Sequence, residues 1–224
     1  QNSRIDEIGN PRLPMSKTVA YELGYDQNLF DQYLLRVAGY YKSKLDQPRT
    51  VTFHGDEGRV NYNKDYPLNY GDVRGLEFTL RKNRGQWIRG FVNYTYMVEK
   101  SGNFGFDDIY ENPTAMQQAI YEYRGYYQSK PIPEPYAKFN IELLSPSEFG
   151  PAVGSVHPFA DWRMSLLGYW RAGDTFTWDA NSPVDVENNV QWADYYNLDA
   201  RFAKNIETGL GRVQVFVDIS NLLN

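Results

Sequence analysis

The stretch from Asn69 to Lys100 reads NYGDVRGLEFTLRKNRGQWIRGFVNYTYMVEK, and its two arms alternate in polarity around one short turn. In the first arm, LEFTLR at residues 76–81 has an apolar side chain at every second position, which is the period of a β-strand. The second arm repeats this alternation from Ile88 to Val98. Gly85 lies in the connection, where a tight turn requires a positive φ. The stretch therefore predicts a long β-hairpin with one apolar and one polar face.

The length of the two arms favours a membrane wall. Each arm has roughly ten residues or more, whereas strands of soluble proteins mostly have about five or six. No run approaches the roughly 18 apolar residues of a membrane helix, so a helical membrane protein is excluded. A mean hydropathy of -0.63 agrees with a membrane β-barrel, because apolar outward and polar inward positions average out along each strand.

Composition excludes several other classes of protein. The net charge is -5, and the charged residues form short mixed clusters without a basic stripe, so no nucleic-acid partner is expected. The sequence has no cysteine, which excludes disulfides, thiolate metal sites and thiol nucleophiles. The N-terminal residues QNSR lack a charged region followed by an apolar stretch. They predict either a signal peptide already removed or an internal piece of a longer protein.

The same alternation recurs along the chain. It predicts strands at about residues 17–26, 33–44, 69–82, 87–99, 136–144, 162–172, 190–204 and 212–220. Pro113 to Arg124 predicts a helix with Asn112 as its N-cap and Gly125 as its stop. Long polar loops are expected at residues 45–68, 101–135 and 172–189, an intermediate connection at 145–161, and short turns elsewhere. Outer-membrane barrels alternate short turns with long loops in this way.

Aromatic and charged residues fit the two faces of such a barrel. Tyrosine and tryptophan lie at the strand ends next to the long loops, as expected of an interfacial girdle. The predicted girdle residues are Tyr41, Tyr70, Tyr94, Tyr96, Tyr136, Trp170 and Tyr196. Charges on the opposite parity require a wet or plugged lumen, because Arg or Lys facing lipid at the midplane costs about 2 to 4 kcal/mol. The predicted lumen-facing charges are Glu77, Arg81, Lys138, Glu142, Arg163, Asp199 and Arg201.

The topology also predicts that the sequence is one part of a barrel. The first strand runs into a short turn, which places the N-terminus outside the cell, whereas a single-chain barrel normally has both ends in the periplasm. The chain ends after an ascending strand at Asn224. The predicted fold is therefore all-β, an antiparallel transmembrane β-barrel segment over residues 1–224, with long external loops and one short helix in a loop.

Several passages resemble, in order, those of TonB-dependent outer-membrane receptors. Gly9 to Leu13 followed by Tyr21 to Tyr25 is similar to the family's GNPxL…YELGY passage, and Gly71 to Leu80 resembles its G…GLELxL strand. Further similar passages are Tyr40-Tyr41-Lys42, Tyr196 to Asp199 and Ser220 to Asn224, which resemble FYK, YxNLD and NLFN.

The resemblance implies a receptor and active transporter in the outer membrane of a Gram-negative-type bacterium. These residues would form about 8 of about 22 strands, in the C-terminal part of the barrel with the last strand missing. The implied partners are outer-membrane lipid and lipopolysaccharide, a plug domain of the same chain and a TonB-type energy-coupling protein, the last two contacted through N-terminal parts that are not in this sequence. A surface lipoprotein is a further candidate partner. The implied cargo is a chelated metal, an oligosaccharide or a peptide.

No catalytic constellation is found, so the protein is not expected to be an enzyme or to hold a metal or cofactor. His54 and His157 lie far apart in predicted connections, and the acidic loop residues match no calcium loop. Flat rings combined with hydrogen-bonding groups make Arg124, Tyr126, Tyr127 and Trp178 the candidate ligand-binding residues. Two rival hypotheses stay open: a passive pore or structural barrel, and a soluble carbohydrate-binding β-sandwich.

Overall fold

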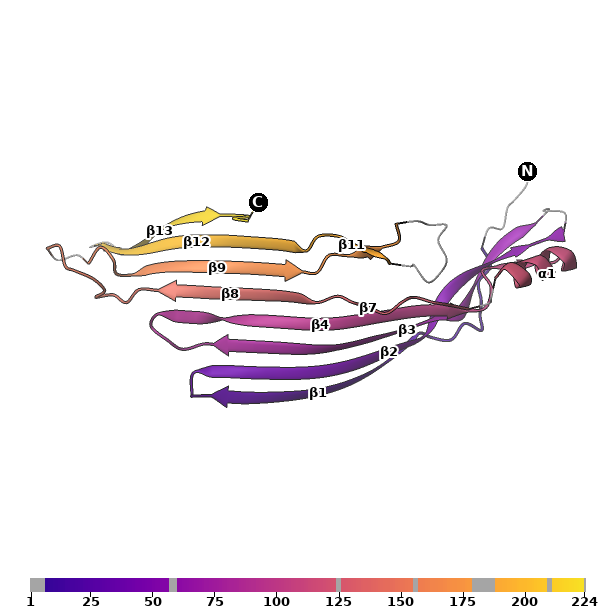
Figure 1. The fold of residues 1–224 in the computed structure, drawn as a ribbon, viewed down its shortest axis with the longest axis horizontal. Helices are drawn as coiled ribbons and strands as arrows, with labels where there is room; N and C mark the ends of the chain where they lie inside the picture. The colour runs from indigo at the N-terminus through magenta and orange to yellow at the C-terminus, as the bar shows by residue number, and fades with distance from the viewer. Residues whose placement is uncertain are drawn as a thin grey trace. The chain divides into compact units, whose positions relative to one another are not determined.

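The computed structural model describes residues 7–56, 60–123, 126–154, 157–178, 188–208 and 211–223. Its main sheet has the strand order β1-β2-β3-β4-β8-β9-β12-β13, so each of these strands lies beside the next long strand of the chain (Figure 1). The bounds are β1 Lys17–Leu29, β2 Tyr33–His54, β3 Asn61–Lys82, β4 Ile88–Phe104, β8 Tyr136–Leu144, β9 Trp162–Arg171, β12 Tyr195–Thr208 and β13 Gly211–Ile219. The sheet is not closed, since β1 and β13 end the strand order of the described residues. The predicted all-β barrel segment is confirmed.

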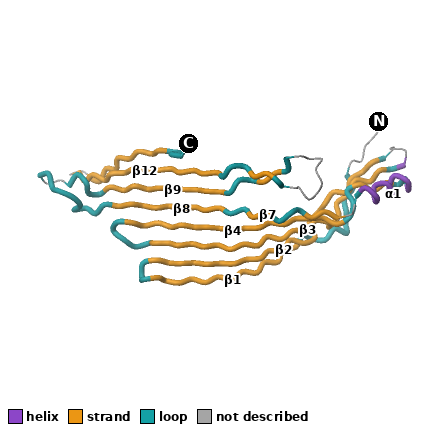
Figure 2. The backbone as a smooth tube through the Cα atoms, in the orientation of Figure 1, coloured by secondary structure: helices purple, strands orange, loops and turns teal. Residues whose placement is uncertain are grey.

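Besides these long strands, the structure has several short strands and one helix (Figure 2). They are β5 Asp108–Tyr110, β6 Tyr126–Gln128, β7 Ile132–Pro133, β10 Thr175–Phe176, β11 Val190–Gln191 and α1 Pro113–Glu122. The predicted loop helix is confirmed, because the Asn112 side chain accepts hydrogen bonds from the backbone N–H groups of Thr114 and Ala115. The helix ends at Glu122, before the predicted end at Arg124, because Tyr123 has an extended backbone and forms the C-cap. Arg124 and the predicted stop Gly125 lie outside the described residues.

The chain divides into two compact units. Unit 1 contains Gln1–Glu22, Tyr40–Arg74 and Val98–Pro133, and unit 2 contains Leu23–Gly39, Gly75–Met97 and Glu134–Asn224. Strands β1 to β4 contribute residues to both units. The other long strands, β8, β9, β12 and β13, belong to unit 2 alone.

The long polar loop expected at residues 45–68 is instead mostly strand. β2 continues to His54 and β3 begins at Asn61, so the connection between them is confined to residues 55–60. Stacked rings stabilise this extension, with the centroids of Phe53 and Tyr62 4.9 Å apart. The prediction was wrong because the apolar alternation in this extension is short: Val51 is buried and shares its parity with Phe53, but most residues around them are polar. Such a polar sequence resembles that of a loop.

The strand predicted at residues 190–204 is also different in the structure. Val190 and Gln191 form β11, which pairs with β10, and the long strand β12 begins only at Tyr195. Residues 192–194 separate the two, and the Trp192 N–H donates to the Asp174 carbonyl, which continues the pairing of β10 with β11. The predicted long loop at 172–189 therefore carries a two-stranded hairpin, whose residues 179–187 lie outside the described part.

Cross-strand register separates two faces of unit 2. Residues opposite each other on neighbouring strands share a face, so Asn93 lies with Lys138, and Val92 lies with Phe139. The apolar face of unit 2 is its exposed one: Leu76, Phe78, Leu80, Val92, Val213, Val215 and Val217 are each 41–59% exposed. Thr95, of the other parity on β4, is buried. This inverted pattern is typical of a membrane wall, because exposed apolar side chains are stable against lipid and unfavourable in water.

Candidate ligand-binding site

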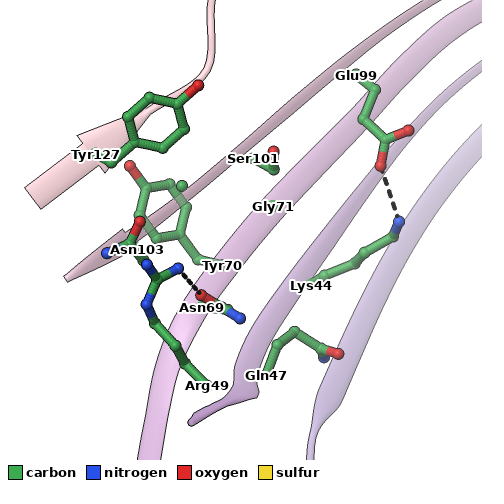
Figure 3. A pocket seen from close by; sticks show the side chains of 11 residues that line it. Lys44, Gln47, Arg49, Asn69, Tyr70, Gly71, Glu99, Ser101, Asn103 and Tyr127 are labelled. Carbon is green, nitrogen blue, oxygen red and sulfur yellow. Dashed lines mark hydrogen bonds and ion pairs between the residues drawn. The ribbon is translucent and has the colours of Figure 1, made fainter. Parts of the chain in front are cut away.

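A cavity of about 350 Å³ lies entirely within unit 1 (Figure 3). Strands β2, β3, β4 and β6 supply its walls. Its lining residues are Lys44, Gln47, Arg49, Asn69, Tyr70, Gly71, Glu99, Ser101, Gly102, Asn103 and Tyr127. Most of these residues carry hydrogen-bonding side chains, but more of the lining surface is apolar than polar, so the cavity is of mixed character.

Arg49 is held in a fixed orientation at the cavity. Its guanidinium group forms a two-pronged ion pair with the Asp107 carboxylate, and its Nη1 donates to the Asn69 Oδ1 at 3.3 Å. Asn69 is held in turn, since its Nδ2 donates to the Pro48 carbonyl at 2.9 Å. The planar guanidinium is thereby pre-organised, which lowers the entropy lost when it contacts a ligand.

A second ion pair lies on the wall of the cavity. The Lys44 Nζ is 3.1 Å from the Glu99 Oε1, and both side chains are partly exposed (Figure 3). Such an exposed pair adds little stability, on the order of 0–1 kcal/mol. It does leave the cavity wall with both a cationic donor and an anionic acceptor.

Two tyrosines supply flat apolar surfaces. The Tyr70 ring stacks on Phe104 with centroids 4.7 Å apart, and Tyr127 is 46% exposed on β6. Gly102 lets these groups approach, because a Cβ there would be 2.5 Å from both the Tyr70 hydroxyl and the Tyr127 carbonyl. Next to it, buried Asn103 donates to the Tyr123 hydroxyl at 3.3 Å. The cavity thus combines rigid rings with donors and acceptors, a mixture that suits hydroxyl-rich or amide-bearing ligands.

The predicted lumen-facing charges lie on one face of unit 2. Register places Lys138 and Glu142 on the same side of the sheet as Arg163, Asp199 and Arg201. Glu77 and Arg81 share this side, because Thr79 between them accepts a hydrogen bond from Asn93 at 2.9 Å and Arg81 lies over the Phe91 ring. Arg201 forms a two-pronged ion pair with Asp218 on β13. That this face borders a lumen stays a prediction.

Comparison with known proteins identifies the family. The family model described as "TonB dependent receptor-like, beta-barrel" matches residues 1–222. The chain belongs to this family. Searches of the curated proteins and of the solved structures find no match. Across the described ranges, no helix is long and apolar enough to cross a membrane.

TonB-dependent receptors are outer-membrane receptors and transporters of Gram-negative bacteria, not enzymes, and the soluble sandwich hypothesis is therefore replaced. The family in general also implies contact with outer-membrane lipid, a plug and a TonB-type protein.

The candidate ligand-binding residues of this receptor have different positions. Tyr127 lines the cavity of unit 1, whereas Trp178 belongs to unit 2, is 76% exposed and follows the hairpin strand β10. Arg124 and the side chain of Tyr126 lie outside the described residues. Sequence reasoning missed Arg49 because it falls in the segment expected to be a loop, and it missed Asn69 because no face was assigned to this first residue of the predicted strand 69–82.

Part of the predicted aromatic girdle forms a row across four strands of the receptor. Tyr94, Ala137, Trp170 and Tyr196 are register partners on β4, β8, β9 and β12. The rings of Tyr94 and Trp170 lie nearly parallel across the small Ala137, with centroids 6.4 Å apart. Tyr96 is exposed on the same parity of β4. That this row lies at a membrane interface stays a prediction.

The other predicted girdle residues have different surroundings. Tyr136 pairs with Thr95 on the polar face, and the Lys138 Nζ lies 5.5 Å from its ring centroid. The prediction that Tyr136 belongs to the lipid-facing row was wrong, because it used position along the strand and ignored parity. Tyr41 and Tyr70 lie within long strands of unit 1 instead of at strand ends. Tyr70 lines the cavity of unit 1, so it is not a simple girdle residue.

Asp194, in the connection before β12, forms hydrogen bonds with two residues of the aromatic row and with a nearby backbone group. Its carboxylate accepts hydrogen bonds from the Trp170 Nε1 at 3.0 Å, from the Gly173 backbone N–H at 3.1 Å and from the Tyr196 hydroxyl at 3.4 Å. These bonds, the Trp170 one first, hold the pKa of Asp194 below its ordinary value.

We expect Asp194 to make the Trp170 environment pH-dependent. Because the folded-state pKa is lowered, its stabilising contribution is complete above the ordinary aspartate pKa of about 3.9 and is lost as the pH falls through the lowered value. Trp170 fluorescence, isolated by Trp170→Phe difference spectra, should therefore change in this acidic window. Asp194→Asn should abolish the transition, and an unchanged transition in that variant would contradict the assignment.

Proposed function

We propose that this chain supplies barrel wall and external vestibule loops to a receptor that takes up a nutrient, energised through an inner-membrane complex. Strand length supports the proposal. A tilted strand crosses a membrane with about 9–11 residues, and β2 and β3 have 22 residues each. Each of these strands is therefore about twice as long as a crossing requires, and residues of both strands line the cavity of unit 1. This cavity is the observation that carries the proposal.

The proposal includes the arrangement of the complete receptor. Residues 1–224 act as one partial barrel domain, with a plug domain of the same polypeptide filling the lumen beside the charged face of unit 2. A TonB-type protein supplies energy through an N-terminal part, and lipopolysaccharide and a surface lipoprotein contact the external side. The charged side chains on the polar face support a hydrated lumen, because charged side chains are unfavourable against lipid.

Among chelated metals, oligosaccharides and peptides, the cavity favours an oligosaccharide. The lining charges Lys44, Arg49 and Glu99 each have an ion-pair partner, so no strong net charge calls for an anionic chelate. The rings of Tyr70 and Tyr127 offer stacking surfaces, and Asn69 and Asn103 offer amide groups. Sugar rings use these same two contacts, apolar stacking on aromatic faces and hydrogen bonds to hydroxyls.

Filling the cavity should block binding. Gln47 lines it, and its side chain bonds only the nearby Leu45 carbonyl among the described residues, so Gln47→Trp adds bulk without breaking a cross-strand contact. We expect a drop in affinity of about tenfold or more for a fluorescent maltodextrin mixture, measured on the purified native protein. Gln118→Trp is the matched control, because Gln118 is exposed on α1 and, within the described ranges, its side chain bonds only to Glu122.

Parallel measurements with a tryptic peptide mixture and ferric citrate test the other two cargo classes. Equal binding by both tryptophan variants for all three probes would overturn the site. Uptake into cells should stop when a protonophore collapses the inner-membrane gradient, whereas binding should persist. Uptake that continues would indicate a passive pore.

A further inference from the structure

Three tyrosines and one lysine form a continuous cluster on the polar face of unit 2. The Lys138 Nζ lies 5.5 Å from the ring centroid of Tyr136 and 5.4 Å from that of Tyr169. The Tyr169 ring lies 5.9 Å from the ring of Tyr195, centroid to centroid. All four residues of this tyrosine–lysine cluster belong to unit 2. We propose that the cluster is a second saccharide-binding site, which takes a sugar unit that carries a carboxylate.

Strand register places the cluster on one side of the sheet, at one end of the strands. Lys138 pairs with Tyr169, while Tyr136 and Tyr195 both pair with Arg171. Register partners share a face, so these side chains lie on the same side. Tyr136 begins β8, Arg171 ends β9 and Tyr195 begins β12, next to the long connections from β4 to β8 and from β9 to β12. The site rests on the proposed function, in which these connections lie outside and the polar face borders a hydrated lumen.

The charge of Lys138 is not compensated by the residues around it. Lys138 makes no hydrogen bond or ion pair with the residues that the structure describes. Tyrosine rings attract an ammonium group but carry no negative charge. The same register row continues to Asn93 on β4 and Asn197 on β12, which are both neutral. Arg171, in the adjacent row, adds a second cation, although it lies 3.4 Å from Asp174 in an exposed ion pair. A carboxylate on the ligand would satisfy the Lys138 donors.

The tyrosine rings add a surface for a sugar ring beside this cation. Tyr195 is 52% exposed, and Tyr136 and Tyr169 are half-buried. The C–H faces of a sugar pack on such rings, and tyrosine hydroxyls can both donate to and accept from sugar hydroxyls. A neutral sugar would leave the Lys138 charge unpaired, and a small carboxylate without a ring would leave the tyrosines uncovered. An acidic sugar uses both parts of the cluster.

The affinity of the purified native protein for fluorescently labelled oligogalacturonate tests this site. We expect Lys138→Gln to weaken binding about tenfold or more, because it removes a charge-assisted hydrogen bond. Arg163→Gln is the matched control for the lost charge, since Arg163 has the same parity on β9 as Tyr169 and lies at the other end of the strand. Tyr195→Ala should also weaken binding, whereas Tyr196→Ala removes an equally exposed ring from the opposite face and should not. Equal affinities within each pair of variants would overturn the site.

Two competitors separate the contribution of the sugar ring from that of the charge. Maltodextrin has rings without carboxylates, and tricarballylate has carboxylates without a ring, so neither should displace the probe as well as unlabelled oligogalacturonate does. Equal displacement by tricarballylate would indicate an anion site only, and equal displacement by maltodextrin a neutral-sugar site; either result would overturn the proposal.

Gln47→Trp distinguishes this cluster from the cavity of unit 1, which Gln47 lines. This variant should keep its affinity for oligogalacturonate even where it loses affinity for maltodextrin. If Gln47→Trp loses oligogalacturonate binding and Lys138→Gln retains it, the acidic sugar binds in the cavity and the cluster is not a site. A failure of the maltodextrin experiment alone would contradict the cavity of unit 1 and leave the result for the cluster intact.

Discussion

Gly90→Ala is expected to prevent formation of a stable barrel wall. Gly90 has a φ of +143° in β4, and a Cβ there would lie 2.0 Å from the carbonyl oxygen of Asn140 on β8. The obstacle is backbone, so no side-chain rotation relieves it, and β4 would have to separate from β8 at this point of the ladder. Backbone strain and overpacking together cost about 2 to 5 kcal/mol, a large part of the stability of a typical domain.

The fraction of protein that migrates as a folded, heat-modifiable band after outer-membrane extraction measures this effect. Gly24→Ala is the control, because the nearest atom to a Cβ there is the Val37 carbonyl oxygen at an ordinary 4.0 Å. Gly168→Ala should be intermediate, since its Cβ would meet the Phe139 ring, which can turn away. If the folded fraction of the Gly90→Ala protein equals that of the Gly24→Ala protein, β4 and β8 do not pair in the register described above.

Arg49→Gln is expected to weaken ligand binding about tenfold or more, because it removes a pre-organised donor from the cavity of unit 1. It also leaves the Asp107 carboxylate unpaired. Both side chains are partly exposed, so stability should fall by only about 1 kcal/mol. The measurement is the affinity for the maltodextrin probe beside the urea midpoint of the same preparation.

Arg36→Gln provides the matched control for this variant. Arg36 forms the same two-pronged ion pair with Asp26, but it belongs to unit 2 and does not line the cavity. It should show a similar small loss of stability with unchanged affinity. If both variants lose affinity equally, the loss comes from general destabilisation, and the cavity does not hold the ligand.

Much of the fold could be predicted from the sequence, because alternation and capping are local signals. The hairpin from Asn69 to Lys100 corresponds to the ends of β3 and β4 that meet at the turn, and Asn112 caps α1 as expected. The extension of β2 and β3 to His54 and Asn61 could not be read in this way. Its strands are held by backbone pairing and by ring contacts such as Phe53 with Tyr62, and the apolar residues in it are too few to form a long alternating pattern.

The candidate site was less predictable, because it depends on contacts between distant residues. Arg49 and Asp107 are 58 positions apart, and only the pairing of β2 with β5 brings them together. Tyr127 was selected as an aromatic loop residue and lies at the cavity, although its contact with a ligand stays a prediction. The face of Tyr136 did have a readable signal, since it shares its parity with Lys138.

Cysteine labelling in intact cells tests the central claim, an outer-membrane wall with its long loops outside the cell and its short turns in the periplasm. The sequence has no cysteine, so each substitution introduces a unique thiol in this chain. With a membrane-impermeant maleimide, Tyr121→Cys on the exposed surface of α1 should label in intact cells, and Arg84→Cys in the short turn should label only after permeabilisation. Phe78→Cys on the apolar face should label in neither case. Labelling of Phe78→Cys, or labelling of Arg84→Cys but not Tyr121→Cys in intact cells, would contradict the account.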